Sequence, residues 1–224
     1  MKKLIYILFF LFSFSFGRAQ FLDSLNLIFR SKSSIDARFE SRFSVYKTNL
    51  IEITGVRLGV AYKRRLRIGG GVSWLKTNLK TTTQIRNQNG ELEEISRYLK
   101  LAYLCYYIDF VFHRTKRWQL SVPIQVGTGA SWFQRDTKYD INNKDPKYFL
   151  LLYEPGITIQ FKVFKWLGAG GDIAQRFVLR NYKKTSDKLF SPTFSVKALF
   201  WPDQLFYQVF PENEISKKFG PAEW

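Results

Sequence analysis

The sequence predicts an all-β protein, an eight-stranded antiparallel up-and-down transmembrane β-barrel with short segments at both chain ends. Three observations predict this fold class: an amino-terminal export signal, eight segments that alternate between apolar and polar residues, and connections that are alternately short and long. Alternation with a period of two is typical of strands. In an exported chain, we expect the apolar face to contact lipid and the polar face to line the barrel.

Residues 1–19 are predicted to be a signal peptide. Two lysines supply the positive start, an apolar stretch from Leu4 to Phe16 follows, and Ala19 ends a site of small residues that signal peptidase recognises. A retained anchor is the alternative, but a membrane-spanning helix needs about 20 apolar residues. We therefore expect the mature chain to begin at Gln20.

The remaining chain divides into three parts. Residues 20–33 form an amino-terminal segment, in which 21–29 has the spacing of a short amphipathic helix. The barrel is expected over 34–201, followed by a tail over 202–224 that is too apolar for a simple linker. Cys105 is the single cysteine, which excludes a disulfide within the chain.

The first strand is expected over 34–46, the second over 51–63 and the third over 66–74. Their polar faces carry acids and bases, whereas the opposite faces carry residues such as Phe39 and Leu58. A basic triplet at 63–65 makes a tight turn between the second and third strands. The connection that follows the third strand is expected to be a polar loop, because Asn-Gln-Asn-Gly at 87–90 is a turn signal.

The fourth strand, over 92–113, has aromatic residues on both faces, so its orientation is deduced from Asp109. A carboxylate in contact with lipid is costly, and we therefore expect Asp109 to face the interior together with Tyr103, Cys105 and Tyr107. The fifth strand, over 118–132, follows a tight turn at 115–117.

The sixth, seventh and eighth strands are expected over 151–163, 167–179 and 193–200. Pro123 and Pro155 cannot donate ladder hydrogen bonds, so we expect bulges or a shifted register near them. Connections after the second, fourth and sixth strands are very short, and those after the third, fifth and seventh are longer. With an even number of strands, both chain ends lie on the side of the short turns.

Two sets of residues are candidate functional sites. The first is a charge network in the barrel interior, made of Asp36, Arg38, Glu40, Arg42, Arg57, Arg67, Asp109, Glu154, Lys162, Asp172, Arg176 and Lys197. An eight-stranded barrel is only wide enough for its side chains, so we expect these charges to pair and fill the interior. The second is an aromatic girdle at the strand ends, made of Tyr62, Tyr98, Phe112, Trp118, Trp132, Trp166 and Trp201.

On the export signal, the strand count and the alternation over Ser34–Trp201, the sequence resembles the small eight-stranded outer-membrane barrels of Gram-negative bacteria, of the OmpX and OmpA transmembrane-domain type. The resemblance implies the bacterial outer membrane, with both termini in the periplasm, and carries over no functional residue. The tail over 202–224 is a departure, since these barrels often end in an aromatic residue.

A structural or scaffolding role is the first functional prediction: an accessory subunit of a cell-envelope assembly, such as secretion or barrel-assembly machinery. The alternative is a narrow anion-preferring pore. A lipid-modifying enzyme is less favoured, because the only histidine, His113, is expected at a periplasmic turn, across the membrane from Ser131 near the outer rim, and Ser73 in mid-strand is no better placed. We expect no catalytic residue, metal site or cofactor.

The formal net charge of +17 predicts anionic partners. For an exported protein we expect outer-membrane lipid and lipopolysaccharide rather than nucleic acid. An envelope protein is expected to bind the tail or the external loops. A soluble lipocalin-like barrel is the main alternative fold, and it would gather Phe39, Leu58 and Ile124 in its centre and expose Arg38 and Arg57.

Overall fold

The structure is a computed structural model that describes residues 26, 28–46, 49–62, 65–86, 92–135, 146–181 and 189–220. The predicted signal peptide lies outside these residues. Of the predicted helix over 21–29, Asn26, Ile28 and Phe29 are described and are helical. Within the described chain, no helix has the length and the apolar character to cross a membrane.

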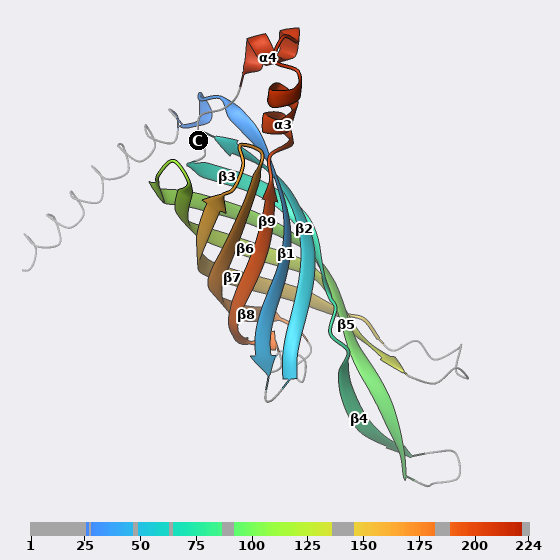
Figure 1. Ribbon diagram of the computed structural model, residues 1–224. Coiled ribbons are helices and arrows are strands. Elements are labelled where there is room, and N and C mark those ends of the chain that lie inside the picture. The colour runs from blue at the N-terminus through green and yellow to red at the C-terminus, as the bar shows by residue number, and fades with distance from the viewer. Residues whose placement is uncertain are drawn as a thin grey trace, which may run out of the picture.

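Strands make up most of the described chain (Figure 1). In order along the sequence, the elements are β1 (Ser33–Tyr46), β2 (Asn49–Tyr62), β3 (Leu66–Leu75), β4 (Leu79–Arg86), β5 (Leu92–Arg114), β6 (Trp118–Arg135), β7 (Tyr148–Lys162), β8 (Leu167–Arg180), β9 (Ser191–Phe200), α3 (Pro202–Val209) and α4 (Glu214–Phe219).

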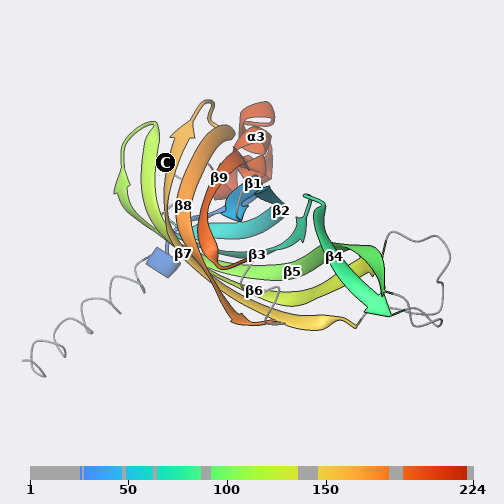
Figure 2. The same ribbon diagram turned by 90° about the horizontal axis from the view of Figure 1, so that it is seen from below.

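The sheet closes on itself. Its order is β3-β2-β1-β9-β8-β7-β6-β5-β4, and β3 also pairs with β5. Both β3 and β4 pair with β5, on successive stretches of that strand, so together they occupy one position in the ring. Every neighbouring pair is antiparallel. The predicted eight-stranded antiparallel barrel is therefore confirmed, and Figure 2 shows it from below.

The prediction of a polar loop after the third strand is wrong over 79–86, where β4 pairs with β5. This pair of strands forms a long hairpin beyond the barrel wall (Figure 1). At the break before β4, Lys76 N donates to Glu52 O over 2.9 Å, and Glu52 N donates to Thr77 Oγ1 over 2.8 Å. These bonds hold the end of β3 on β2, whereas the threonine-rich segment that follows has the strand propensity to continue along β5 alone.

Burial is inverted relative to a soluble protein. Phe39, Leu58 and Ile124 are 52%, 61% and 45% exposed on the outer wall, whereas Arg38 and Arg57 are buried inside. An apolar outer wall around a charged interior is the arrangement that a barrel in lipid requires, and it excludes the lipocalin-like alternative. The fold is that of a transmembrane β-barrel.

The predicted orientation of β5 is correct. Tyr103, Cys105, Tyr107 and Asp109 are all buried. A bulge between Val111 and His113 shifts the pairing of β5 with β6 by one residue, at the end of the strand. The inserted residue allows the last part of β5 to leave the regular alternation without moving the interior face of the rest of the strand.

Pro123 and Pro155 interrupt the hydrogen-bond ladder between β6 and β7 but do not shift its register, contrary to the prediction. The β6–β7 pairing is interrupted between Ser121↔Thr158 and Ile124↔Pro155, but the register is the same on both sides of the gap. The irregularity in the β7–β8 pairing lies at Leu151 and Leu152. A proline removes one donor from the ladder, and the remaining bonds of a long strand hold the register.

The two ends of the barrel differ in their connections. The turns 62–66, 114–118 and 162–167 define the short-turn end, and the connections 86–92, 135–148 and 180–191 define the long-loop end. Figure 1 shows β1 beginning and β9 ending at the short-turn end, with α3 and α4 beyond them. Pro202 occupies the first turn of α3, and the side chain of Asn213 caps α4 by accepting a hydrogen bond from Ile215 N.

Candidate functional site

The middle of the barrel interior is a cluster of ion pairs around Arg42. This guanidinium, on β1, pairs with Glu154 of β7. Its Nη2 atom also lies 3.2 Å from Glu40 Oε1 and 3.4 Å from Asp172 Oδ2. All four side chains are buried. One base therefore links β1 to β7 and β8, whose partner residues lie 112 and 130 positions further along the chain.

Lys197 and Arg57 complete this central cluster. Lys197 Nζ lies 2.6 Å from Asp172 Oδ2 and 3.7 Å from Glu40 Oε2, and it donates to Thr158 Oγ1 over 3.3 Å. Arg57 pairs with Glu40. Arg176, which pairs with Glu154, and Gln125, which accepts from Arg57, extend the cluster around the wall. Each carboxylate thus has at least two bases, as burial of charge requires.

A second cluster lies nearer the short-turn end. Arg38 Nε donates to Asp36 Oδ2 over 2.9 Å, and Arg38 Nη1 lies 3.2 Å from Asp109 Oδ2. Arg67 Nε lies 3.3 Å from the same carboxylate oxygen. The ring of Tyr107 connects the two clusters, because its centroid is 5.0 Å from the Arg38 guanidinium and 5.6 Å from that of Arg57.

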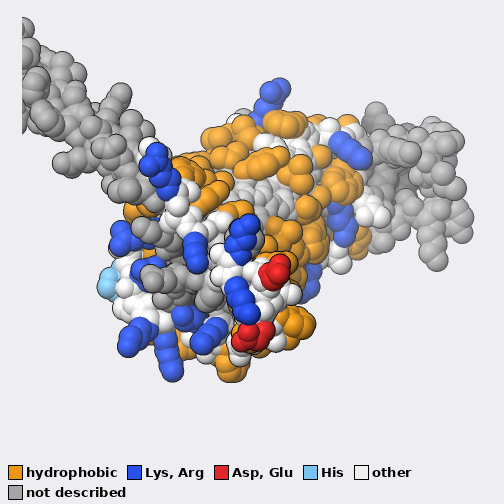
Figure 3. All heavy atoms as spheres, turned by 90° about the horizontal axis from the view of Figure 1, so that it is seen from above, with side chains coloured by type: hydrophobic (Ala, Val, Ile, Leu, Met, Phe, Trp, Pro, Cys, Tyr) orange, Lys and Arg blue, Asp and Glu red, His pale blue; other side chains and the backbone are white. Residues whose placement is uncertain are grey.

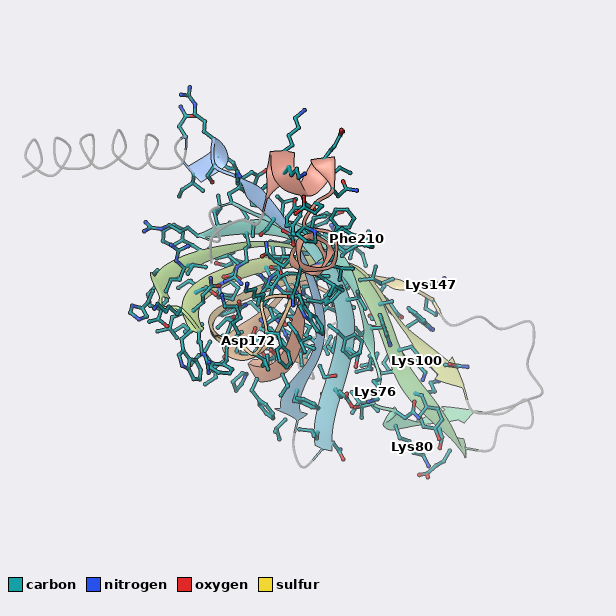
Figure 4. All side chains as sticks on the ribbon, turned by 45° about the horizontal axis from the view of Figure 1, so that its top comes forward. Lys76, Lys80, Lys100, Lys147, Asp172 and Phe210 are labelled. Atoms are coloured by element: carbon teal, nitrogen blue, oxygen red, sulfur yellow. The ribbon has the colours of Figure 1, made fainter. Side chains whose placement is uncertain are left out.

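Eleven of the twelve predicted network residues are buried, five acids and six bases. Figure 4 shows one of them, Asp172, within the barrel. The twelfth, Lys162, is only half-buried, since it is the last residue of β7 and lies at the rim. Its main-chain N–H donates to Arg117 O over 2.8 Å. Lys162 therefore lies at the edge of the buried network.

Glycines make room for the large side chains of the interior. Gly59 and Gly69 face each other across β2 and β3, next to the hydroxyl of Tyr107. A Cβ atom on Gly69 would lie 2.7 Å from that hydroxyl and 2.6 Å from Gly59 Cα. Only glycine at this position lets the two strands and the tyrosine approach so closely.

The long-loop end of the interior is apolar, which the sequence reasoning missed. The buried side chains here are those of Ile51, Ile53, Leu75, Leu79, Leu99, Leu101, Tyr103, Cys105, Leu150, Leu152 and Leu189. Ile51, Leu99 and Leu150 have the same strand parity as the interior charges, and this parity could have revealed them. We call this set the apolar core.

At the short-turn end, Trp201 is buried in the barrel and does not belong to the aromatic girdle. It is 2% exposed, and its ring lies against Gly168, where an added Cβ would come within 2.8 Å. Side chains alternate between the two faces of a strand, and Phe194 and Val196 point outward. Trp201 lies an odd number of residues after each of them, so its side chain points inward where the chain leaves β9 for α3.

The other predicted girdle residues lie at the barrel ends on the outer wall. Phe112 and Trp118 are exposed there, whereas Tyr62, Tyr98, Trp132 and Trp166 are half-buried. Three of them pack against a neighbouring ring, with centroids 5.0 Å apart for Tyr62 and Phe29, 4.7 Å for Trp118 and Phe161, and 5.8 Å for Trp166 and Phe164. The ring of Trp132 lies under Lys147, with 5.7 Å between the ring centroid and Nζ.

The structure does not bring the candidate groups for nucleophilic catalysis together. His113 is exposed at the short-turn end of β5. Ser131, near the long-loop end of β6, donates to Asn181 Oδ1 over 2.8 Å, and Ser73 is buried inside the barrel. Within the described residues, no group of three or more histidine, cysteine, aspartate or glutamate side chains could hold a metal ion.

Comparison with known proteins yields similar folds only. No family model and no curated protein matches the sequence. Neisserial surface protein A is 9% identical over 76% of this chain and 97% of its own, with a TM-score of 0.48. Ail, the attachment invasion locus protein of Yersinia pestis, is 10% identical over 75% and 96%, with a TM-score of 0.43. A major outer membrane protein from Thermus thermophilus is 9% identical over 75% and 98%, with a TM-score of 0.44.

The fold implied by the sequence resemblance is confirmed by the strand order and the burial of this chain itself. Eight antiparallel strand positions close into a ring, the wall is apolar, and the interior is filled by paired charges and leucines. These are the features of barrels that span the bacterial outer membrane. The chain is a transmembrane β-barrel of the outer-membrane type.

Proposed function

We propose that this chain is a structural or accessory subunit of a cell-envelope assembly in the bacterial outer membrane, and that its barrel conducts no solute. The observation that carries this proposal is the filled interior. Trp201 occupies the short-turn end, the two ion-pair clusters occupy the middle, and the apolar core occupies the long-loop end. An eight-stranded barrel leaves no room beside such side chains.

Conductance across a planar bilayer tests the closed barrel. We expect the reconstituted mature chain to give no current steps, whereas a sixteen-stranded porin in the same bilayer conducts. The second candidate, a narrow anion-preferring pore, is favoured by the excess of six buried bases over five buried acids. Reproducible anion-selective steps would establish that candidate and contradict ours.

A barrel that conducts nothing acts through its ends. At the short-turn end, Val209, Phe210 and Ile215 expose apolar side chains on and beside α3 and α4, and Figure 4 labels Phe210 there. Apolar side chains that remain in water mark a surface for another protein. We assign this surface to an envelope protein, and the β4–β5 hairpin to contacts at the opposite end.

Crosslinking in native membranes, followed by pull-down, tests the partner surface. We expect the double variant F210S/I215S to lose a partner that the wild-type chain captures. The matched control is F190S, because Phe190 is equally exposed at the opposite end of the barrel. A partner set unchanged in F210S/I215S would remove the docking role of the helices.

The proposed orientation places the short-turn end and both termini in the periplasm. Because Cys105 is buried, cysteines introduced at Glu212 and Lys80 can be labelled selectively. In intact cells, we expect an impermeant maleimide to label K80C and not E212C. The reverse pattern would invert the orientation.

The lipid partner of the long-loop end follows from the same orientation. Lys76, Lys80, Lys100 and Lys147 lie on this part of the molecule (Figure 4), where the phosphates of lipopolysaccharide would face them. Lys76 Nζ is already 3.0 Å from Glu52 Oε1, and Lys100 Nζ donates to Asn78 Oδ1 over 2.9 Å. We propose Lys80 and Lys147 for this contact; Lys147 Nζ lies 5.7 Å from the centroid of the Trp132 ring, a contact that leaves its charge available to a phosphate.

A further inference from the structure

A pocket of about 450 Å³ lies on the outside of the barrel at the short-turn end, between the beginning of β1 and helix α3. Its lining residues are Arg30, Ser31, Lys32, Ser33, Ser34, Ile35, Val60, Asp203 and Tyr207. Three separate segments of the chain meet here: residues 30–35, which run into the start of β1, the end of β2 and the first two turns of α3.

The wall of the pocket nearest the membrane is apolar. Ile35 and Val60 are cross-strand partners of β1 and β2, and both are exposed on the outer wall of the barrel. One further outward pair, Ser33 and Tyr62, lies between them and the short-turn end. In a membrane, this wall contacts acyl chains, so the pocket begins where the hydrocarbon ends.

The second wall is basic. Arg30 and Lys32 both line the pocket with exposed side chains. Their segment is held in place at two points, because the ring of Phe29 packs on Tyr62 with centroids 5.0 Å apart, and the hydroxyl of Ser31 donates to Ile28 O. Two bases on a fixed segment can bind one phosphate with charge-assisted hydrogen bonds.

The third wall, on α3, carries a carboxylate and a phenol. Asp203 and Tyr207 lie one helical turn apart, so their side chains share a face. Burial and the charge of Asp203 raise the pKa of Tyr207. Gln204 Nε2 donates to Asp203 Oδ2 over 3.2 Å and fixes the carboxylate.

We propose that this pocket binds the headgroup of an ethanolamine phospholipid, with the phosphate at Arg30 and Lys32 and the ammonium at Asp203. The two bases and the single acid match a group that carries one negative and one positive charge. Ile35 and Val60 supply the contact for the first carbons of an acyl chain. The proposed binding depends on the pocket and on the transmembrane fold, and only the assignment to the periplasmic leaflet rests on the proposed orientation.

General attraction of lipid by positive charge does not account for this pocket. Figure 3 shows lysine and arginine side chains spread over the short-turn end, and the exposed ones outside the pocket include Arg65, Lys116, Arg117 and Lys165. Such a surface attracts any anionic headgroup. The pocket places a carboxylate, Asp203, on the same lining as two bases, whereas the exposed Glu212 and Glu214 of this end do not line it. A carboxylate beside the two bases disfavours purely anionic lipid and selects a headgroup with an ammonium.

Native mass spectrometry of the purified full chain tests the proposal with short-chain phospholipids. We expect one dihexanoyl phosphatidylethanolamine to bind per barrel, and R30Q/K32Q to weaken this binding about tenfold or more, because two charge-assisted bonds are lost. D203N should weaken the binding of the ethanolamine lipid several-fold, whereas the binding of dihexanoyl phosphatidylglycerol should stay unchanged or become tighter.

The matched control is R117Q/K165Q, which removes two charges from the same end outside the pocket. The proposal requires that this variant bind like the wild-type chain, and that all variants show the heat-dependent gel shift of a folded barrel. Equal weakening in the control, or no weakening in R30Q/K32Q, would overturn the pocket. Displacement of the lipid by inorganic phosphate or glycerophosphoethanolamine at equal concentration would overturn the role of the apolar wall and of the lipid.

Discussion

The two parts of the barrel interior solve the same problem with opposite chemistry. Near the short-turn end and in the middle, eleven charged side chains are buried as ion pairs. At the long-loop end, the apolar core fills the interior with leucine, isoleucine and aromatic side chains. In the charged part, each of the eleven side chains has an opposite charge beside it.

The difference concerns register. Arg42 meets Glu154 and Asp172 only if β1, β7 and β8 are correctly aligned, because ion pairs depend on position and direction. A slip of one residue would turn these charges toward lipid. Apolar side chains tolerate small displacements, since their packing has little directional preference. The charged part therefore specifies the barrel, and the apolar part mainly fills it.

The largest effect is expected from removing the central base. Arg42→Met leaves Glu40, Glu154 and Asp172 each with one partner fewer. Glu154 then keeps only Arg176, and Asp172 keeps only Lys197. We expect the free energy of unfolding to fall by about 3–5 kcal/mol, because a buried carboxylate that loses one of its bases is strongly destabilising. Urea titration in lipid vesicles, followed by tryptophan fluorescence, measures it. Lys165→Met, at an exposed turn, serves as the control. A loss below about 1 kcal/mol would show that the charges do not specify the barrel.

The apolar core offers the next test. Leu150 is completely buried, and Leu150→Ala is expected to cost about 2–5 kcal/mol by creating a cavity. Leu150→Met nearly conserves the volume and should cost less than about 1.5 kcal/mol. The same urea titration compares the two variants. Equal losses would mean that this part also depends on exact shape, which would remove the contrast with the charged part.

Two adjacent glycines distinguish the interior from the wall. A Cβ on Gly69 would meet Leu58 O, Gly59 Cα and the Tyr107 hydroxyl, whereas the nearest atom to a Cβ on Gly70 is Cys105 O at 3.3 Å. We expect Gly69→Ala to destabilise the barrel by about 1–3 kcal/mol through overpacking, and Gly70→Ala to be nearly neutral. The fraction of each variant that refolds into vesicles, measured by the gel shift, compares Gly69→Ala with Gly70→Ala. The reverse order of effects would contradict the placement of Tyr107.

The smallest effect is expected at an exposed ion pair. Lys76 Nζ is 3.0 Å from Glu52 Oε1, but the Lys76 side chain is 62% exposed. Lys76→Gln should change the free energy of unfolding by less than about 1 kcal/mol, and the change should shrink further in high salt. A loss as large as that of Arg42→Met would indicate that location in the interior does not determine the strength of these pairs.

Much of this fold could be predicted from the sequence because a strand has a period of two. Asp109 alone oriented β5 correctly, since a charge in lipid is costly. The errors fall where the period gives no information. The break between β3 and β4 depends on hydrogen bonds that join Lys76 and Thr77 to Glu52. The burial of Trp201 depends on where the chain turns from β9 into α3.

The sequence by itself determined which residues face lipid and which face the interior, because alternation follows from backbone geometry. Only the tertiary structure decided which charges pair, that leucines close the long-loop end, and that Arg30 and Asp203 line one pocket. These contacts join segments that are distant along the chain. Their geometry arises from ring closure and strand stagger, which no local pattern encodes.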